Sequence, residues 1–134
     1  MTRIASSSLK IDLASLLAGD TLQVLAGFLR KNQRALKLAT LLLFDTLVRN
    51  YHQHLNPGNL QPVLVELPPL LSESDLHIAQ LTLNLLTSIA RLQRGCLATV
   101  TSTSLPHVLR LAQSPLLQGA ALSAMLDFFQ VGTA

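Results

Sequence analysis

Charged, aromatic and cysteine residues are scarce in this sequence. Among its 134 residues there are one cysteine, one tyrosine and no tryptophan, and only 13% are charged, against about 25% in an ordinary globular domain. Cys96 has no partner for an internal disulfide, which fits a reducing compartment. The net charge of +3 is mild, and there are almost no aromatic side chains to stack on bases. We therefore do not expect nucleic-acid binding.

Long apolar runs are also missing. The longest uncharged windows reach about 16 residues and contain polar side chains or a proline, whereas a membrane-spanning helix needs roughly 20 apolar residues. Near the start of the chain, Lys10 and Asp12 precede a short apolar stretch, and no clean cleavage site follows it. We therefore expect neither a membrane span nor a signal peptide.

The sequence is instead rich in apolar residues arranged with helical periodicity. Segment 75–90, "DLHIAQLTLNLLTSIA", carries two apolar stripes on a helical wheel. The stripes consist of Ile78, Leu81, Leu85 and Ile89, and of Leu76, Ala79, Leu83, Leu86 and Ala90. One polar sector remains, formed by His77, Gln80, Asn84, Thr87 and Ser88. A helix with two apolar stripes must be covered on at least two sides, so other helices are expected on both.

An internal repeat explains this pattern. Residues 25–48 align with residues 67–90 at a shift of 42, and a third copy at 111–129 follows about 41 residues later. Each copy predicts a helix, a tight polar turn and a second helix, with the turns near 30–33, 72–75 and 113–115. We expect one block over residues 1–134, with approximate repeats at 13–50, 56–91 and 102–131.

Local signals refine these elements. Ser114 predicts an N-cap, with Pro115 at the first helical position, where its missing N–H costs nothing. Ser74 is expected to cap the helix that follows it. Pro68–Pro69 should bend or shorten the helix before the second turn. The polar run 99–106 predicts a loop that enters the first helix of the third copy.

A period of about 41–42 residues with two helices per unit is typical of HEAT arrays. The predicted fold class is all-α, an α-solenoid of about three HEAT-type helical hairpins. A single six-helix bundle with a coincidental period is the alternative. An armadillo array is less suited, because the sequence leaves no room for its extra short helix. No hairpin has the polar face of a terminal cap, so we expect a fragment of a longer array.

Three segments also resemble a known family. "FLRKNQRALKL" (28–38), "ELPPLLSESDLH" (66–77) and "SPLLQGAALSAMLDFFQ" (114–130) closely resemble the cullin-associated, neddylation-dissociated proteins, in the same order and at similar spacing. The resemblance implies a non-enzymatic scaffold, cytoplasmic and nuclear, that binds cullin–RING complexes lacking their ubiquitin-like modifier. It also implies that the scaffold promotes exchange of substrate receptors in ubiquitin ligases. A generic HEAT or armadillo-type scaffold with other protein cargo, such as a transport receptor or phosphatase scaffold, is the alternative.

No pattern of residues predicts catalysis or a cofactor. The six glycines form neither a phosphate-binding loop nor a dinucleotide fingerprint. His52 and His54 stand two apart with no further ligand close in sequence, which disfavours a metal site. Cys96 has no identifiable base beside it. We expect no enzyme, metal site, cofactor or small-molecule substrate.

One charge cluster is the candidate site for a partner. Arg30, Lys31 and Arg34 are the predicted partner-binding residues, and Lys37 follows them. They would suit an acidic protein surface, where charge sets the association rate more than the affinity. The alternative interpretation is a solvated turn between two helices of a repeat.

Overall fold

The computed structural model describes residues 19–133, and within this range every regular element is helical. The longer helices are α2 (Gly19–Phe28), α3 (Arg34–Tyr51), α4 (Gln61–Glu66), α5 (Leu76–Leu92), α6 (Leu97–Ala112) and α7 (Gly119–Thr133). Single 3₁₀ turns join them at η1 (His52–His54), η2 (Pro57–Leu60), η3 (Pro68–Leu70) and η4 (Arg94–Cys96). The predicted all-α class is confirmed.

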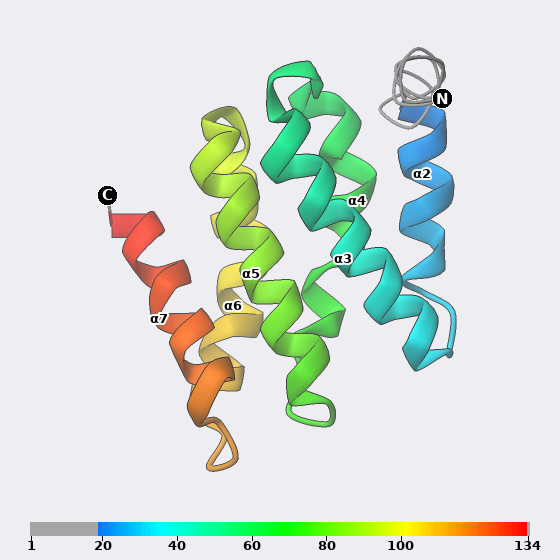
Figure 1. Ribbon diagram of the computed structural model, residues 1–134. Helices are drawn as coiled ribbons and strands as arrows, with labels where there is room; N and C mark the ends of the chain where they lie inside the picture. Colours follow the sequence, from blue (N-terminus) through cyan, green and yellow to red (C-terminus); the bar gives the residue numbers. More distant parts are fainter. Residues whose placement is uncertain (1–18, 134) are drawn as a thin grey trace, which may run out of the picture.

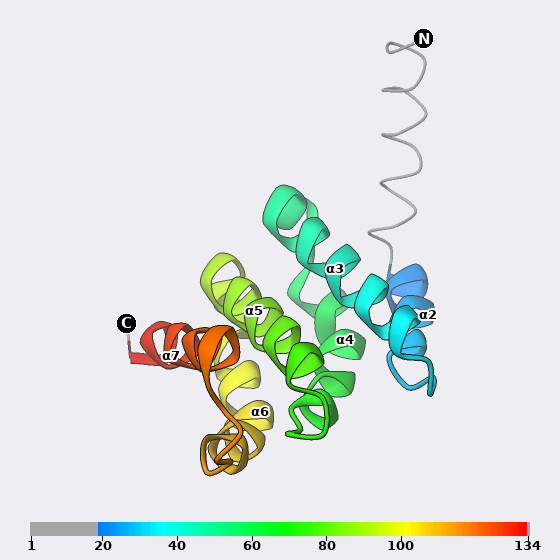
Figure 2. The ribbon, with the colours of Figure 1, turned by 60° about the horizontal axis from the view of Figure 1, so that its bottom comes forward.

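The helices form three hairpins stacked side by side in two layers (Figures 1 and 2). Helices α3, α5 and α7 make one row, and α2, α4 and α6 make the other. Along the first row α5 packs against both α3 and α7, and along the second α4 packs against α2 and α6. Each hairpin therefore contacts its sequence neighbour, as in an α-solenoid. The three polar turns occupy 29–33, 71–75 and 113–118, close to where the repeat predicts them.

Helix α5 shows why the chain needs two covered faces. Asp75 accepts a hydrogen bond from the backbone N–H of Ile78 and so caps the start of the helix. Residues from both predicted stripes are buried, with Leu83 and Leu86 fully enclosed. Burial of each such leucine stabilises the fold by roughly 1.5–3 kcal/mol. The prediction for Thr87 is wrong, because it was assigned to the polar sector and the structure buries it.

The second hairpin confirms the predicted effect of its prolines. Helix α4 ends at Glu66, and Pro68 and Pro69 follow it in η3. Proline has no backbone N–H to continue the helical hydrogen bonds and disfavours α-helical geometry in the residue before it. The first helix of this hairpin is therefore a short α-helix followed by a 3₁₀ turn.

The expected loop at 99–106 is wrong, because these residues lie within α6. Two of their hydroxyl groups find an acceptor inside the helix: Ser102 and Thr103 donate to the carbonyl of Thr99 at 3.2 and 2.7 Å. Val100 and Ser104 are fully buried on the face that packs into the stack. Tertiary packing has thus overridden the weak helix propensity of serine and threonine.

Two expected helix starts are also wrong. Asp75, rather than Ser74, caps α5. Helix α7 begins at Gly119 instead of Pro115, and Gly119 has a positive φ of 61°, which glycine adopts without steric cost. Ser114 instead organises a turn, accepting a hydrogen bond from the N–H of Leu116.

The division into a single 1–134 block with repeats at 13–50, 56–91 and 102–131 stays a prediction. The part of the first repeat before Gly19, and the chain start at Lys10 and Asp12, lie outside the described residues.

Candidate interaction surface

The turns of the three hairpins lie along one edge of the stack, at the bottom of Figure 1. We call this surface, formed by residues 29–33, 71–75 and 113–118, the turn edge. The linkers between hairpins lie at the other end of the helices. The predicted partner-binding residues all fall at or beside the first turn, so the turn edge is the candidate surface.

Arg30 and Arg34 form ion pairs with the second hairpin. The Nε of Arg30 lies 3.2 Å from Oε2 of Glu66. The Nε of Arg34 donates to Oδ2 of Asp75 at 2.7 Å, and its Nη2 donates to Oδ1 at 3.5 Å. Both arginine side chains are more than half exposed, so each pair contributes only about 0–1 kcal/mol. These two residues connect neighbouring hairpins.

Asp75 is the most connected group of the turn edge. Its carboxylate binds Arg34 and also accepts the capping N–H of Ile78. The hydrogen bond from Arg34 lowers the pKa of this carboxyl below its ordinary value, and the N–H of Ile78 acts in the same direction. Asp75 is therefore a charged structural group at neutral pH.

Other cations on this side of the stack form no ion pair within the described part of the chain. Lys31 is exposed, Lys37 is half-buried and Arg110 is exposed, and within residues 19–133 none of them has an ion pair. The carboxylates of Glu66 and Asp75 are already engaged by arginine. Together with the flanking helix ends, this side of the stack carries five cations, Arg30, Lys31, Arg34, Lys37 and Arg110, against three carboxylates, Glu66, Glu73 and Asp75, which leaves a net charge of +2 that is available to a partner.

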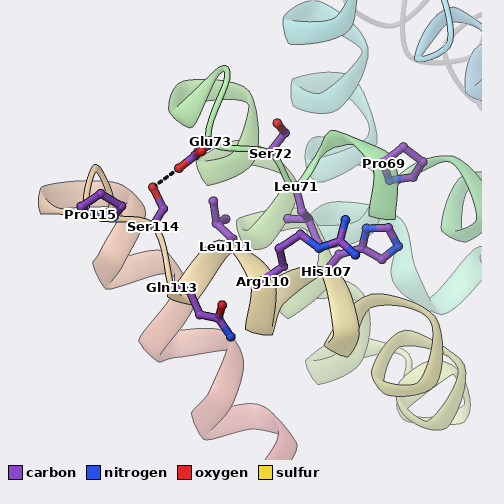
Figure 3. Close-up of a pocket in the computed structure, with 10 residues that line it drawn as sticks. All are labelled: Pro69, Leu71, Ser72, Glu73, His107, Arg110, Leu111, Gln113, Ser114 and Pro115. Carbon is purple, nitrogen blue, oxygen red and sulfur yellow. Dashed lines mark hydrogen bonds between the residues drawn. The ribbon is translucent and has the colours of Figure 1, made fainter.

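A groove crosses the turn edge between the second and third hairpins (Figure 3). Its volume is about 570 Å³. The lining residues are Pro69, Leu71, Ser72, Glu73, His107, Arg110, Leu111, Gln113, Ser114 and Pro115. Leu71 and Leu111 are buried, whereas Pro69 and Pro115 are exposed, so the groove has an apolar base and rigid, accessible rims.

One hydrogen bond spans the groove: the hydroxyl of Ser114 donates to Oε2 of Glu73, the dashed line in Figure 3. Arg110 and His107 are three residues apart on α6 and so share a helical face. The groove thus combines an engaged carboxylate with an uncommitted guanidinium.

The contacts between hairpins repeat at the period of the sequence. Arg34 with Asp75, Glu73 with Ser114, and Gln93 with the carbonyl of His52 are each 41 residues apart. Gln93 also donates to the carbonyl of Leu55 at 3.0 Å, which joins the two linkers at the opposite edge. Asp45 and Ser88, 43 residues apart, make a further contact between α3 and α5. The stack is therefore held in register by polar contacts between positions about one repeat apart.

The partners of the arginines in the predicted cluster, Glu66 and Asp75, were not predicted from the sequence. The contact between Ser114 and Glu73 was not predicted either. The shift of 42 between the first two copies places Arg34 on Leu76, so opposite charges one residue away from equivalent repeat positions were the available signal.

Residues considered for other chemistry lie apart from this surface. Cys96 is buried, and burial raises the pKa of its thiol. His52 and His54 lie in the linker η1. Within residues 19–133, no three histidine, cysteine or carboxylate side chains gather so that they could hold a metal ion. In the same range, no helix has the length and apolar character needed to cross a membrane.

Stacked α-helical hairpins with a repeat of about 41–42 residues and polar contacts between positions about one repeat apart define a HEAT-type α-solenoid. Comparison with known proteins then gives the family. The chain is 49% identical to cullin-associated NEDD8-dissociated protein 1 of Drosophila melanogaster over 130 residues, which is 97% of this chain and 10% of that protein. It is 44% identical to cullin-associated NEDD8-dissociated protein 2 of Mus musculus over 135 residues, 99% of this chain and 11% of the mouse protein.

A plant relative extends the range of the match. Cullin-associated NEDD8-dissociated protein 1 of Arabidopsis thaliana is 38% identical over 131 residues, 95% of this chain and 11% of that protein. No protein-family model matches the chain. The chain belongs by sequence to the cullin-associated NEDD8-dissociated proteins, as the resemblance predicted, and it spans about a tenth of the length of these relatives.

Proposed function

We propose that this chain is a non-enzymatic, protein-binding scaffold segment of a cullin-associated factor. The observation that carries the proposal is the match of 49% identity across 97% of the chain to a cullin-associated protein. In this role the segment works within a longer helical array that binds unmodified cullin–RING complexes. The array promotes exchange of substrate receptors during ubiquitin ligase assembly.

The fold supports a scaffold role. Stacked hairpins expose long rows of helices and turns, and such surfaces suit extended protein partners. An array that contacts its partner at several places gains affinity from linked contacts without requiring a strong contact in any one hairpin. A segment of three hairpins then contributes curvature and a share of the contacts.

The charge distribution supports an acidic partner surface. Lys31 is the one member of the predicted cluster without an internal ion pair, and Lys37 and Arg110 lie near the same edge. Arg30 and Arg34 remain part of the proposed surface because more than half of each side chain is exposed. Exposed charges of this kind affect association rate and salt dependence more than the dissociation rate.

A binding experiment tests this surface. We propose replacing the matching segment of a full-length relative with this chain, and measuring association with an unmodified cullin–RING complex. Lys31→Glu should slow association about threefold to tenfold at low salt, and the effect should shrink at higher salt, where charges are screened. The matched control is Arg94→Glu, a free cation in η4 at the linker edge, which should leave the rate unchanged.

The outcomes separate the surface from the function. If both variants slow association equally, the effect is one of net charge and the turn edge is not the contact surface. If the protein carrying this chain does not bind cullin at all, the generic scaffold with other cargo is favoured instead. The proposal also includes an intracellular location, cytoplasmic and nuclear. Accumulation of a fluorescently tagged protein in the secretory pathway would contradict it.

A further inference from the structure

The third turn contains a dipeptide that occurs once in the chain. Ser114–Pro115 is the only serine or threonine followed directly by proline, because the other five prolines follow asparagine, glutamine, leucine or proline. Proline-directed serine/threonine kinases recognise this dipeptide as their minimal acceptor. The dipeptide lies in a turn outside both neighbouring helices, where a kinase can bind the chain without unwinding a helix.

The turn is accessible at Pro115 and Leu116, and Ser114 beside them is half-buried. Helix α6 ends at Ala112 and α7 begins only at Gly119, so six residues between them lie outside regular helix. Pro115 and Leu116 are exposed, and Leu116 is 55% exposed although it is apolar. The backbone hydrogen bond from the N–H of Leu117 to the carbonyl of Ser114 is long, at 3.3 Å between nitrogen and oxygen. Segments with few buried contacts open at low cost, which is what binding in a kinase cleft requires.

The groups around the Ser114 hydroxyl determine how a phosphate on it would affect the groove. The Ser114 hydroxyl donates to the carboxylate of Glu73, across the groove between the second and third hairpins. Arg110 lines the same groove and has no ion pair among the described residues. A phosphate here would lie beside the carboxylate of Glu73, whereas the side chain of Arg110 extends away from Ser114 toward His107 (Figure 3).

We propose that Ser114 is a phosphorylation site for a proline-directed serine/threonine kinase, and that its phosphate opens the groove between the second and third hairpins. In the transfer, Ser114 Oγ forms a bond to the γ-phosphorus of ATP, and the bond between that phosphorus and the β,γ-bridging oxygen breaks. ADP leaves, and the hydroxyl proton passes to the base of the kinase.

The phosphate changes the contact in two ways. It has no hydroxyl proton to donate to Glu73, and its charge of roughly −1.5 to −2 at neutral pH repels that carboxylate. The contact that spans the groove is therefore lost. Arg110 is an uncommitted cation that lines the same groove, and it becomes the expected partner of the phosphate once its side chain turns toward Ser114. The turn 113–118 moves away from Glu73 as a result.

A kinase assay tests the site. The folded chain is incubated with Mg–ATP and, in parallel, with a cyclin-dependent kinase or a mitogen-activated protein kinase. Sites are then mapped by mass spectrometry, with Ser114→Ala as the control. A synthetic peptide of residues 109–120 reports recognition of the dipeptide without the fold. We expect one phosphate, at Ser114, in both chain and peptide. A peptide that is phosphorylated while the folded chain is not, or no phosphate in either, would overturn the proposal.

A melting experiment tests the switch. Phosphorylation should lower the melting temperature by roughly 3–6 °C, the shift expected for loss of about one surface contact in a domain of this size. Glu73→Gln should reduce this shift, and Arg110→Ala should enlarge it. An unchanged shift in Glu73→Gln would show that the phosphate does not act through that carboxylate. Neither experiment needs cullin, so their failure is independent of the proposed function.

Discussion

Leu83→Asp should unfold the stack, whereas Gln80→Asp, three residues away on the same helix, should barely affect it. Leu83 is completely enclosed between hairpins, and Gln80 lies half-buried in the polar sector of α5. Both changes introduce the same carboxylate into the middle of the same helix. The pair therefore isolates burial from charge and from helix propensity.

The magnitude follows from the burial of Leu83. Removing a buried leucine side chain costs about 2–5 kcal/mol through lost burial and the cavity left behind. An unpaired carboxylate in its place costs several kcal/mol more. The sum reaches the total stability of a typical domain, about 5–15 kcal/mol. Gln80→Asp should cost less than about 1 kcal/mol, because only a small difference in helix propensity separates the two residues.

Urea unfolding followed by far-ultraviolet circular dichroism measures both variants at low micromolar concentration. Leu83→Ala provides a graded variant, with an expected loss of about 2–5 kcal/mol. We expect Leu83→Asp to be largely unfolded before urea is added, and Gln80→Asp to unfold close to the wild-type midpoint. Equal shifts for the two aspartate variants would refute the assignment of buried and polar faces on α5.

Three further predictions follow from the contacts at the two edges and at the ends of the stack. The pKa of Asp75 is lowered in the folded state, so its contribution to the free energy of unfolding is fully present above its ordinary pKa of 3.8. This contribution is lost as the pH falls through the lower pKa of the folded state. Urea titrations at several pH values should show a smaller loss of stability in acid for Asp75→Asn than for the wild type. Gln93→Ala removes the donor to two linker carbonyls and should cost about 1–2 kcal/mol in urea unfolding, whereas Gln113→Ala, an exposed residue, should be silent. The isolated chain should self-associate in light scattering, because Leu42 and Leu126 on the outermost hairpins are 52% and 53% exposed. Leu126→Glu should shift it toward the monomer, and a monomeric wild type would contradict this.

The fold could be predicted where the signal is local. The two apolar stripes of α5 and the period near 41 residues follow directly from the spacing of apolar residues in the sequence. The positions of the three turns follow from aligning the copies. Pro68 and Pro69 act through their own covalent geometry, so their effect on α4 was also predictable.

The errors lie where tertiary packing decides. Ser104 belongs to a polar run with weak helix propensity, but the structure encloses it completely within α6. Thr87 falls in the polar sector of the wheel and is nevertheless buried. Helix α7 begins at Gly119, which has a positive φ, and Ser114 bonds to Glu73 of the neighbouring hairpin instead of capping α7. None of these contacts is visible from a window of neighbouring residues.

The candidate surface was found only in part. The cluster of Arg30, Lys31 and Arg34 is evident from composition, but the ion pairs that engage two of the three depend on stacking at a separation of about one repeat. The groove at Ser114 could not be predicted, since it exists only when the second and third hairpins are packed together.

The most direct measurement exchanges the matching segment of Drosophila melanogaster cullin-associated NEDD8-dissociated protein 1 for this chain and asks whether the product still binds cullin. An unrelated block of three HEAT hairpins at the same place serves as the control. In a pulldown, the protein carrying this chain should retain the unmodified cullin–RING complex and should not retain the complex carrying the ubiquitin-like modifier. A folded exchange protein that retains neither complex, or that behaves like the control block, would contradict the proposal that this chain is a cullin-associated scaffold segment.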